Sequence, residues 1–267
     1  MNERPQTWHY GLVAQWWAEF GADGPETAYF RGVIERYGQP ALDVGCGTGR
    51  LLLPYRRAGL DVDGCDISPD MLALCRRQAD REGLSVNLYE QAMHELDLPR
   101  TYRTIFISGS FGLGGERAHG MEALRRFHDH LEPNGVLAMD HHPPYAGIGA
   151  SYWSYWLKDE RGSLPEPWPP LGQGRRASDG TDFHMNTRVL DVDPLEQVGT
   201  LQIRVERRRD GRLVAEEEHT LKKCDYFKGE LLMMLEQACF RDIEVRGGYT
   251  DEEANADHRI LVYVARK

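Results

Sequence analysis

A glycine turn between two expected strands constrains this chain more than any other feature. The stretch ALDVGCGTGRLLLPYRRAGLDVDGCDIS at residues 41–68 joins an apolar run to three alternate glycines, a helical pattern, a second apolar run and an acid, Asp66. A glycine turn between a strand and a helix lets the backbone approach a ligand and directs unpaired N–H groups toward it. An acid that ends the next strand can accept both ribose hydroxyls of an adenosine. The stretch therefore indicates a cofactor that contains adenosine.

The spacing of the glycines separates two classes of such cofactors. The dinucleotide fingerprint is GxGxxG, in which the third glycine lets the helix pack closely on the strand. Counted from Gly45, the place of that third glycine is taken by Arg50, whose guanidinium is a poor helix–sheet contact. The sequence instead reads DVGCGTG from Asp43 to Gly49, with an acid inside the strand. A nicotinamide dinucleotide is therefore disfavoured.

LDVGCGTG followed by GCDISPDML resembles the class I S-adenosylmethionine-dependent methyltransferases. The resemblance covers residues 38–140 and 226–267 and extends to the order of the expected elements. It implies that the glycine loop passes beneath the methionine and ribose of S-adenosylmethionine, and that the acid closing the second strand holds the ribose hydroxyls. The residues that the resemblance assigns to cofactor binding are Tyr10, Asp43, Gly45, Cys46, Gly47, Gly49, Asp66, Ile67, Met71, Ala92, Met93 and Ser108.

Some of these positions carry specific expectations from the resemblance. Asp43 orients the loop or binds the methionine ammonium through water, and Ile67 packs on adenine. Members of the family often have an acid after the third strand that accepts the adenine amino group, but the matching residue here is Ala92. Adenine is then expected to be held by the backbone of Ala92 and Met93, or by Gln91 in place of the acid.

Short apolar runs that alternate with helical patterns predict an α/β fold. Such alternation is typical of right-handed βαβ units, so we expect a Rossmann-like, mostly parallel seven-stranded sheet with helices on both faces. The RDGR turn at residues 209–212 predicts an antiparallel hairpin within a β-rich insertion between the fifth and sixth strands. The strands expected in the parallel core lie at residues 41–44, 62–67, 86–89, 104–108, 136–140, 243–246 and 259–265.

The expected elements divide the chain into three parts. Residues 1–37 form an N-terminal helical lid, residues 38–142 and 226–267 form the methyltransferase core, and residues 143–225 form the insertion, which covers the acceptor site. In the lid, Tyr10 and Trp17 are expected near the sulfonium because an aromatic face stabilises a cation. The alternative for the tryptophan is packing against the core. The aromatic residues of the insertion also have two alternatives: they contact the acceptor, or they pack only against one another. These residues are Tyr152, Trp153, Tyr155, Trp156 and Trp168.

A histidine pair at the end of the fifth strand supplies the candidate general base. If the acceptor is a hydroxyl or a protonated amine, a proton must be removed, and His141 or His142 is expected to take it. The alternative is a local structural role. Side chains that are adjacent on a strand point to opposite faces, so no metal site is expected from Asp140 and these histidines. His94 is also within expected reach of the cofactor. Three histidines on an expected surface helix are predicted to be solvated: His119, His128 and His130.

Composition and charge restrict the partners. The formal net charge is −10 and the pI is about 5.5, which disfavours nucleic acid and anionic membrane surfaces, since both attract basic proteins. The five cysteines form no CxxC pair, and the N-terminus lacks the layout of a signal peptide, so we expect a cytoplasmic protein. The chain is expected to methylate nitrogen or oxygen of a small-molecule acceptor, as a monomer or homodimer. A protein methyltransferase and a non-catalytic cofactor-binding regulator remain open.

Overall fold

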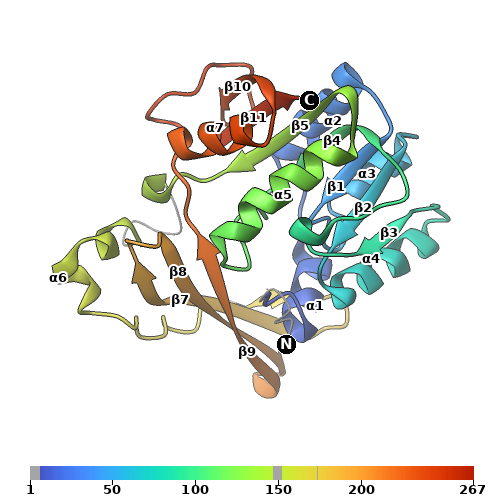
Figure 1. The fold of residues 1–267 in the computed structure, drawn as a ribbon. Helices are drawn as coiled ribbons and strands as arrows, with labels where there is room; N and C mark the ends of the chain where they lie inside the picture. Colours follow the sequence, from blue (N-terminus) through green and yellow to red (C-terminus); the bar gives the residue numbers. More distant parts are fainter. Residues whose placement is uncertain (1–6, 147–151, 173) are drawn as a thin grey trace.

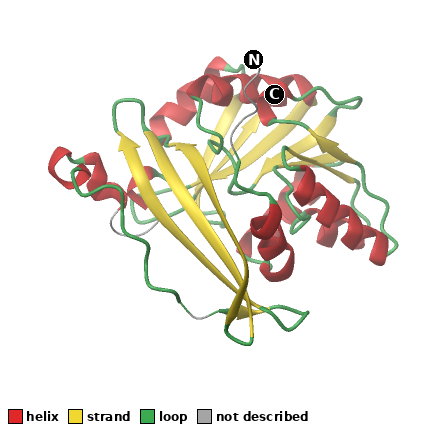
Figure 2. Ribbon diagram, turned by 90° about the horizontal axis from the view of Figure 1, so that it is seen from below, coloured by secondary structure: helices red, strands yellow, loops and turns green. Residues whose placement is uncertain are grey.

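The computed structural model describes residues 7–146, 152–172 and 174–267, which form two sheets (Figure 1). The larger sheet has seven strands and carries helices on both faces. The smaller sheet has four antiparallel strands. It lies beside the larger sheet, as the view from below shows (Figure 2). Among the described residues, no helix is long and apolar enough to cross a bilayer.

The seven-stranded sheet has the order β10-β11-β5-β4-β1-β2-β3. Strands β1 to β5 pair with one another in parallel, and β11 runs antiparallel to both β5 and β10. The chain leaves β1 in one direction and returns to β4 on the other side, which creates the crevice in which open α/β sheets bind ligands. The prediction of a Rossmann-like fold is confirmed. The strands are β1 (Ala41–Val44), β2 (Val62–Asp66), β3 (Leu88–Glu90), β4 (Tyr102–Ile107), β5 (Leu131–His141), β10 (Arg241–Gly247) and β11 (Leu261–Arg266).

Helices cover the two faces of this sheet. Side chains of α2 (Pro25–Tyr37), α3 (Leu52–Arg57) and α4 (Pro69–Arg81) belong to one buried cluster. Side chains of α5 (Arg117–His130) and α7 (Lys228–Gln237) belong to a second cluster on the other face. Each cluster excludes water from one side of the parallel strands, which is why β1 is buried throughout and β4 is buried along most of its length.

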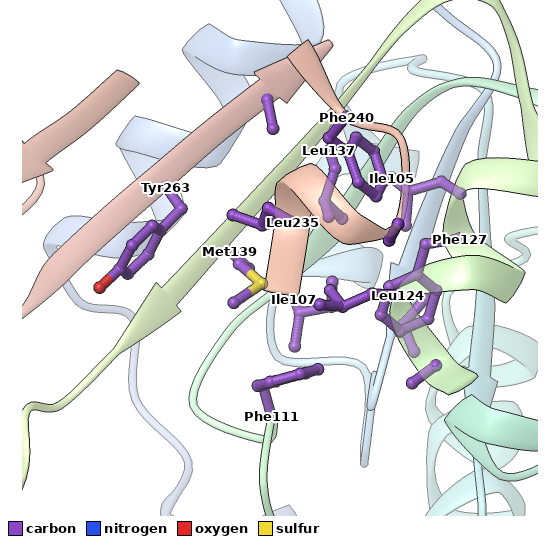
Figure 3. Close-up of a cluster of buried hydrophobic side chains, with 14 of the residues drawn as sticks. Ile105, Ile107, Phe111, Leu124, Phe127, Leu137, Met139, Leu235, Phe240 and Tyr263 are labelled. Carbon is purple, nitrogen blue, oxygen red and sulfur yellow. The ribbon is translucent and has the colours of Figure 1, made fainter. Parts of the chain in front are cut away.

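Strand β4 shows how one run of sequence serves both faces. Ile105 and Ile107 belong to the cluster with α5 and α7, whereas Phe106 between them belongs to the cluster with α2 and α3. This follows from the twofold alternation of side chains along a strand. Figure 3 shows the two isoleucines beside Leu124 and Phe127 of α5.

The smaller sheet lies in the chain between β5 and β10, as predicted. It has the order β6-β7-β8-β9, from β6 (Arg175–Arg176), β7 (Asp182–Asp193), β8 (Val198–Arg209) and β9 (Arg212–Cys224). The RDGR turn joins β8 to β9, with φ of 50° at Asp210 and 77° at Gly211. Positive φ at both central residues matches the twist of a two-residue hairpin.

Helix α1 (Gly11–Phe20) packs between the two sheets rather than on the parallel strands. It contacts α4 on one side and β8 and β9 on the other. Figure 1 shows α1 between β9 and α4. Leu12 and Val13 share a buried cluster with Phe183, Ile203 and other residues of the smaller sheet.

Several element boundaries differ from prediction. The helical pattern after the glycine turn predicts a helix at 50–58, but the helix begins at Leu52, because residues 48–51 form a turn. The residues EPNG at 132–135 are typical of a turn, but they belong to β5, which begins at Leu131. Strand β3 is confined to Leu88–Glu90. The remaining short helical segments are η1 (Met93–Glu95), η2 (Pro144–Ala146), η3 (Tyr152–Trp156) and α6 (Lys158–Arg161).

Candidate active site

A cavity of about 270 Å³ opens at the carboxyl ends of β1, β2, β3 and β4. Its floor and walls come from the residues that follow each of these strands. The N-terminal segment closes it from above, through Thr7, His9 and Trp17. This is the position at which open α/β sheets bind their ligands. Of the twelve residues predicted to bind the cofactor, ten line the cavity: Asp43, Gly45, Cys46, Gly47, Asp66, Ile67, Met71, Ala92, Met93 and Ser108.

The glycine turn forms the part of the floor that follows β1. Gly45 and Gly47 have φ of 74° and 55°, a conformation that residues with a Cβ adopt rarely. A Cβ at Gly45 would collide with the Ser110 hydroxyl. Gly49 does not line the cavity; a Cβ there would lie 2.6 Å from the Cys75 sulfur of α4. Gly49 therefore serves the packing of α4 beneath the turn, and a role in binding stays a prediction.

Asp66 ends β2 and ties the turn to the start of α4. Its Oδ2 accepts a hydrogen bond from the Gly47 N–H at 2.9 Å, and its Oδ1 accepts one from the Ser68 N–H at 2.8 Å. Burial raises the pKa of Asp66, while these backbone N–H groups and that of Ile67 oppose the rise. Each carboxylate oxygen has a further lone pair, so Asp66 can accept from a ligand in the cavity without breaking the turn.

Asp43 lies deeper, inside β1, and is 2% exposed. Burial raises its pKa to about 8, against the opposing charge of Arg50. Within the described residues, its Oδ2 has no hydrogen-bond partner. A buried polar atom without a partner costs about 1–3 kcal/mol, which indicates that a donor from outside the chain completes the site.

The loop after β3 forms the other end of the cavity. Ala92 caps the short helix η1, and its backbone and that of Met93 face the cavity. The Gln91 amide is occupied: Nε2 donates to the Asp97 carbonyl at 3.0 Å and Oε1 accepts from the Asp97 N–H at 2.8 Å. Adenine was expected to be held either by Gln91 or by the backbone of Ala92 and Met93. Because the Gln91 amide already has hydrogen-bond partners, the structure favours the backbone of Ala92 and Met93.

Comparison with known proteins agrees with this geometry. Residues 41–135 match the family model described as "Methyltransferase domain". Over 267 residues the chain is 23% identical to a candidate methyltransferase of Geobacillus sp. (strain WCH70), covering 97% of this chain and 99% of that protein. A solved S-adenosylmethionine-dependent methyltransferase from Clostridium acetobutylicum superposes with a TM-score of 0.70 at 15% identity, covering 96% of this chain and 97% of that one. A sugar N-methyltransferase from Streptoalloteichus sp. superposes with a TM-score of 0.68 at 19% identity, covering 98% and 97%.

Residues 41–135 match a methyltransferase domain, and the chain has the fold of solved S-adenosylmethionine-dependent methyltransferases. The cavity fits S-adenosylmethionine in two respects. The unpartnered oxygen of Asp43 matches a cationic group, and an added Cβ at Gly47 would meet Met71 at 3.4 Å, so the backbone of Gly47 can lie close to a ligand. Both residues line the cavity.

The cavity also contains a histidine pair that was not predicted. The rings of His94 and His119 stack with centroids 3.7 Å apart and planes 6° apart, and both line the cavity. Burial, followed by the neighbouring His119, lowers the pKa of His94. Two carboxylates stand nearby, Glu116 at 3.4 Å from His119 Nε2 and Glu95 at 4.0 Å from His94 Nε2.

The prediction that the histidines of α5 are simply solvated was wrong. His119 belongs to the cavity wall, and its position four residues before Ala123 and eight before Phe127 places it on the apolar face of α5. That spacing was the available signal. His128 packs edge-on against Phe240. His130 accepts a hydrogen bond from the Leu98 N–H through Nε2 at 2.9 Å.

Among the described residues that line the cavity, neither His141 nor His142 is found. His141 is buried, and its Nε2–H donates to the Tyr226 carbonyl at 3.0 Å. Burial lowers the pKa of His141 to about 3. His142 is exposed. The role of a general base for either residue stays a prediction.

Asp140, just before this pair, fixes the turn after β4. Its carboxylate accepts from the Ser108 hydroxyl at 2.8 Å, from the Gly109 N–H at 2.5 Å and from the Tyr249 hydroxyl at 2.8 Å. Ser108, predicted to bind the cofactor, therefore lines the cavity with its hydroxyl already donated. In the described part of the chain, no three His, Cys, Asp or Glu side chains are grouped to hold a metal ion.

The N-terminal segment places His9, and not Tyr10, on the cavity. Tyr10 precedes α1 as its N-cap and is outside the described lining. His9 Nε2 accepts from the Trp8 indole N–H at 3.2 Å, and Nδ1 bonds to the Thr7 hydroxyl at 2.9 Å. Burial lowers the pKa of His9 to about 4, so the ring is neutral near pH 7. Contact of Tyr10 with the cofactor stays a prediction.

The aromatic residues of the insertion pack against one another, against other residues of the insertion and against Phe227 of the core. Trp153 stacks on Trp156, and both rings meet Phe227 edge-on. The Trp168 ring has the guanidinium carbons of Arg188 and Arg204 within 4.5 Å and 4.2 Å of its centroid. The remaining two insertion aromatics bond to acids: Tyr152 to Asp225 and Tyr155 to Glu166.

Proposed function

We propose that this chain transfers the methyl group of S-adenosylmethionine to a nitrogen or oxygen atom of a small molecule of the natural-product or sugar-like class. The observation that carries the proposal is a cavity at the carboxyl edge of the sheet that combines the glycine turn with two buried acids, Asp43 and Asp66. A cofactor with a cationic end and a ribose satisfies both acids. The methyl group of S-adenosylmethionine is already activated by the positive charge of its sulfonium.

The order of the residues along the sheet edge assigns a direction to the bound cofactor. Asp43 belongs to β1 and Asp66 to the neighbouring β2, and Ala92 follows β3 at the edge of the sheet. In the proposal, Asp43 takes the cationic end, Asp66 accepts the ribose hydroxyls, and the backbone of Ala92 and Met93 meets the purine. Ile67 and Met71 supply the apolar cover for the ring.

The acceptor has to reach the methyl group in line and in the absence of water. The three-part division of the chain serves this need: residues 38–142 and 226–267 hold the cofactor, and residues 1–37 act as the lid. In the described part of the lid, His9 and Trp17 face the cavity. Residues 143–225, proposed as acceptor cover, support α1 from behind through the smaller sheet.

A small-molecule acceptor is supported by the limited volume of the cavity and by the likeness to a sugar N-methyltransferase. That likeness covers 98% of this chain, so it includes the smaller sheet and not the core alone. We propose the same acceptor class here, with an amine or hydroxyl on a ring-sized molecule.

Calorimetric titration with S-adenosylhomocysteine and with NAD tests the cofactor. Asp66→Ala is the test variant, and Asp80→Ala, on the exposed face of α4, is the matched control. We expect micromolar binding of S-adenosylhomocysteine by the wild type and the control, loss of binding in Asp66→Ala, and no binding of NAD. Binding of NAD, or no binding of S-adenosylhomocysteine by folded protein, contradicts the proposal.

Turnover tests the acceptor. The protein is incubated with S-adenosylmethionine and a panel of amino sugars, hydroxylated small molecules and peptides, and S-adenosylhomocysteine formation is measured. We expect turnover with at least one small molecule and none with peptides. Turnover with peptides alone makes the chain a protein methyltransferase, and binding without turnover across a broad panel favours the regulator.

A further inference from the structure

Arg50 takes the place of the third glycine of a dinucleotide-binding site. The glycine turn itself does not require an arginine at this position. In the structure Arg50 belongs to the turn that precedes α3, since that helix begins two residues later at Leu52. Its side chain is 25% exposed and lines the cavity. Arg50 is therefore not a helix–sheet contact but part of the binding wall.

The guanidinium is held in place from α2. Its Nη1 donates to Glu26 Oε1 in a close ion pair, and the Glu26 side chain is 14% exposed. The stem of the arginine passes beside Gly21, where an added Cβ would lie 3.9 Å from Arg50 Cδ. A guanidinium has five N–H donors, and Glu26 is the acceptor found for it among the described residues, so the face toward the cavity retains donors.

Arg50 and Asp43, the acid of β1, both line the cavity. The positive charge of Arg50 is the main influence that opposes the burial-driven rise of the Asp43 pKa. Asp43 also has the oxygen without a hydrogen-bond partner in the described structure. The lining of the cavity thus includes a carboxylate and a guanidinium that interact electrostatically.

Of the residues that line the described cavity, Arg50 is the one lysine or arginine. A ligand carboxylate in this cavity has no other fixed cation to meet. Arginine binds carboxylates through two parallel N–H···O bonds, which are among the stronger hydrogen bonds in proteins. A neighbouring acid and arginine match a group that carries an ammonium and a carboxylate on the same carbon.

We propose that Arg50 binds the α-carboxylate of the methionine part of the cofactor while Asp43 takes the α-ammonium, so that the two residues together recognise the amino-acid end. Glu26 is the positioning residue that holds the guanidinium at the wall. This inference rests on the proposed function. It explains why an arginine occurs at the place where a dinucleotide-binding site has the glycine that lets its helix pack on the strand.

The test compares three ligands that differ only at the amino-acid end. S-adenosylhomocysteine has both charged groups, its decarboxylated analogue retains only the ammonium, and methylthioadenosine has neither. Each is titrated calorimetrically into the wild type, Arg50→Gln, Arg50→Lys and Glu26→Gln. Arg57→Gln is the control, because Arg57 pairs with Glu82 on the exposed surface away from the cavity.

We expect Arg50→Gln to weaken S-adenosylhomocysteine about 10- to 100-fold, since hydrogen bonds to charged groups contribute about 1.5–3 kcal/mol. The affinities for the decarboxylated analogue and for methylthioadenosine stay within about twofold. Arg50→Lys retains part of the preference for the carboxylate, and Glu26→Gln lowers it by a smaller factor than Arg50→Gln. The control matches the wild type.

An equal loss of affinity for all three ligands in Arg50→Gln makes the residue structural and overturns the inference. Unchanged affinity for S-adenosylhomocysteine overturns it too. If Arg50→Gln does not fold, Arg50→Lys and Glu26→Gln decide, because an unchanged ratio between S-adenosylhomocysteine and its decarboxylated analogue in both is a contradiction. Failure of the wild type to bind any of the ligands contradicts the proposed function instead.

Discussion

Asp43 shows at the scale of one residue how a binding group opposes stability. Its carboxyl is buried with one oxygen unpartnered, and burial raises its pKa to about 8. A carboxyl whose pKa is higher in the folded state stabilises the fold below its ordinary value and loses that contribution as the pH rises toward the folded value. Asp43 is therefore a stability cost across pH 4 to 8, retained for binding.

Replacement of Asp43 by Asn removes the charge and keeps the shape. We expect Asp43→Asn to be more stable than the wild type at pH 8, with a difference that grows from pH 4 upward by at most about 1.4 kcal/mol per pH unit. The same variant loses affinity for S-adenosylhomocysteine. Urea unfolding at several pH values measures the first effect and calorimetry the second. A stability difference that is independent of pH would show that the carboxyl titrates normally.

The stacked rings of His94 and His119 make a second residue-scale prediction. Because a charge on one ring disfavours a charge on the other, His119→Gln should raise the pKa of His94 toward its ordinary value. Titration followed by NMR on the His94 ring measures the shift. His128→Gln, farther along the same helix, is the control and should leave it unchanged. An unmoved His94 titration would show that the rings are not in contact in solution.

At this scale the sequence predicted most of the cofactor wall, because DVGCGTG and Asp66 are close in sequence and their geometry is local. The histidine pair escaped prediction because residues 94 and 119 meet only after η1 packs on the start of α5. The prediction for His141 relied on its position at the end of a strand, where open α/β sheets bind ligands. The ring of His141 instead donates a hydrogen bond to the Tyr226 carbonyl.

Among the elements, α1 is attached by its first turn to two different parts of the chain. The Gly11 N–H donates to Asp70 of α4 at 2.8 Å, and the Leu12 N–H donates to Glu217 of β9 at 2.8 Å. The Ser68 hydroxyl also donates to the His9 carbonyl at 2.5 Å. The free N–H groups of a helix start favour such acceptors. The lid is thus fastened to the core and to the smaller sheet at the same point.

Loss of one fastening should loosen α1 without unfolding the core. We expect Glu217→Gln to increase amide exchange in α1 about fivefold, since a helix-capping side chain contributes about 1 kcal/mol. Strands β1 and β4 should keep their protection. Hydrogen exchange read by mass spectrometry measures both, with Glu216→Gln, exposed on the other face of β9, as control. Equal exchange in the variant and the control would mean that α1 is held by its apolar contacts alone.

The element order was predictable because alternating apolar runs and turn residues are periodic signals. The boundaries were less predictable. Residues 48–51 form a turn because Gly49, with φ of 86°, does not have a helical conformation, and residues 132–135 belong to β5. Propensity describes a single segment, whereas the neighbouring strand β4 decides where β5 begins pairing.

The arrangement of the whole molecule gives the smaller sheet a role that composition did not reveal. The aromatic residues of the insertion were expected either on an acceptor or on one another. In the structure Trp153 and Trp156 pack on each other and on Phe227, and the Trp168 ring contacts the guanidinium groups of two arginines. The apolar face of the smaller sheet packs on Leu12, Val13 and the tryptophans of the lid. Composition identifies side chains that need burial, but only the assembled layers show which partner buries them.

Buried neutral histidines couple the stability of the whole molecule to pH. Burial lowers the pKa of His141 to about 3, whereas the unfolded chain takes up a proton near the ordinary value of 6.5. The unfolded state therefore binds more protons between these values, and stability falls as the pH drops below about 6.5. His9, with a pKa of about 4, acts in the same direction.

Replacement of His141 by Gln separates this structural role from the predicted catalytic one. The amide can still donate to the Tyr226 carbonyl but does not titrate, so the fall in unfolding free energy between pH 6.5 and pH 4 should be smaller by up to about 1.4 kcal/mol per pH unit. Affinity for S-adenosylhomocysteine should stay within about twofold of the wild type. His142→Gln, at an exposed position, leaves the pH dependence unchanged. If His141→Gln keeps the wild-type pH dependence of stability and abolishes turnover at unchanged cofactor affinity, the ring is reaching the acceptor after all and the general-base prediction is restored.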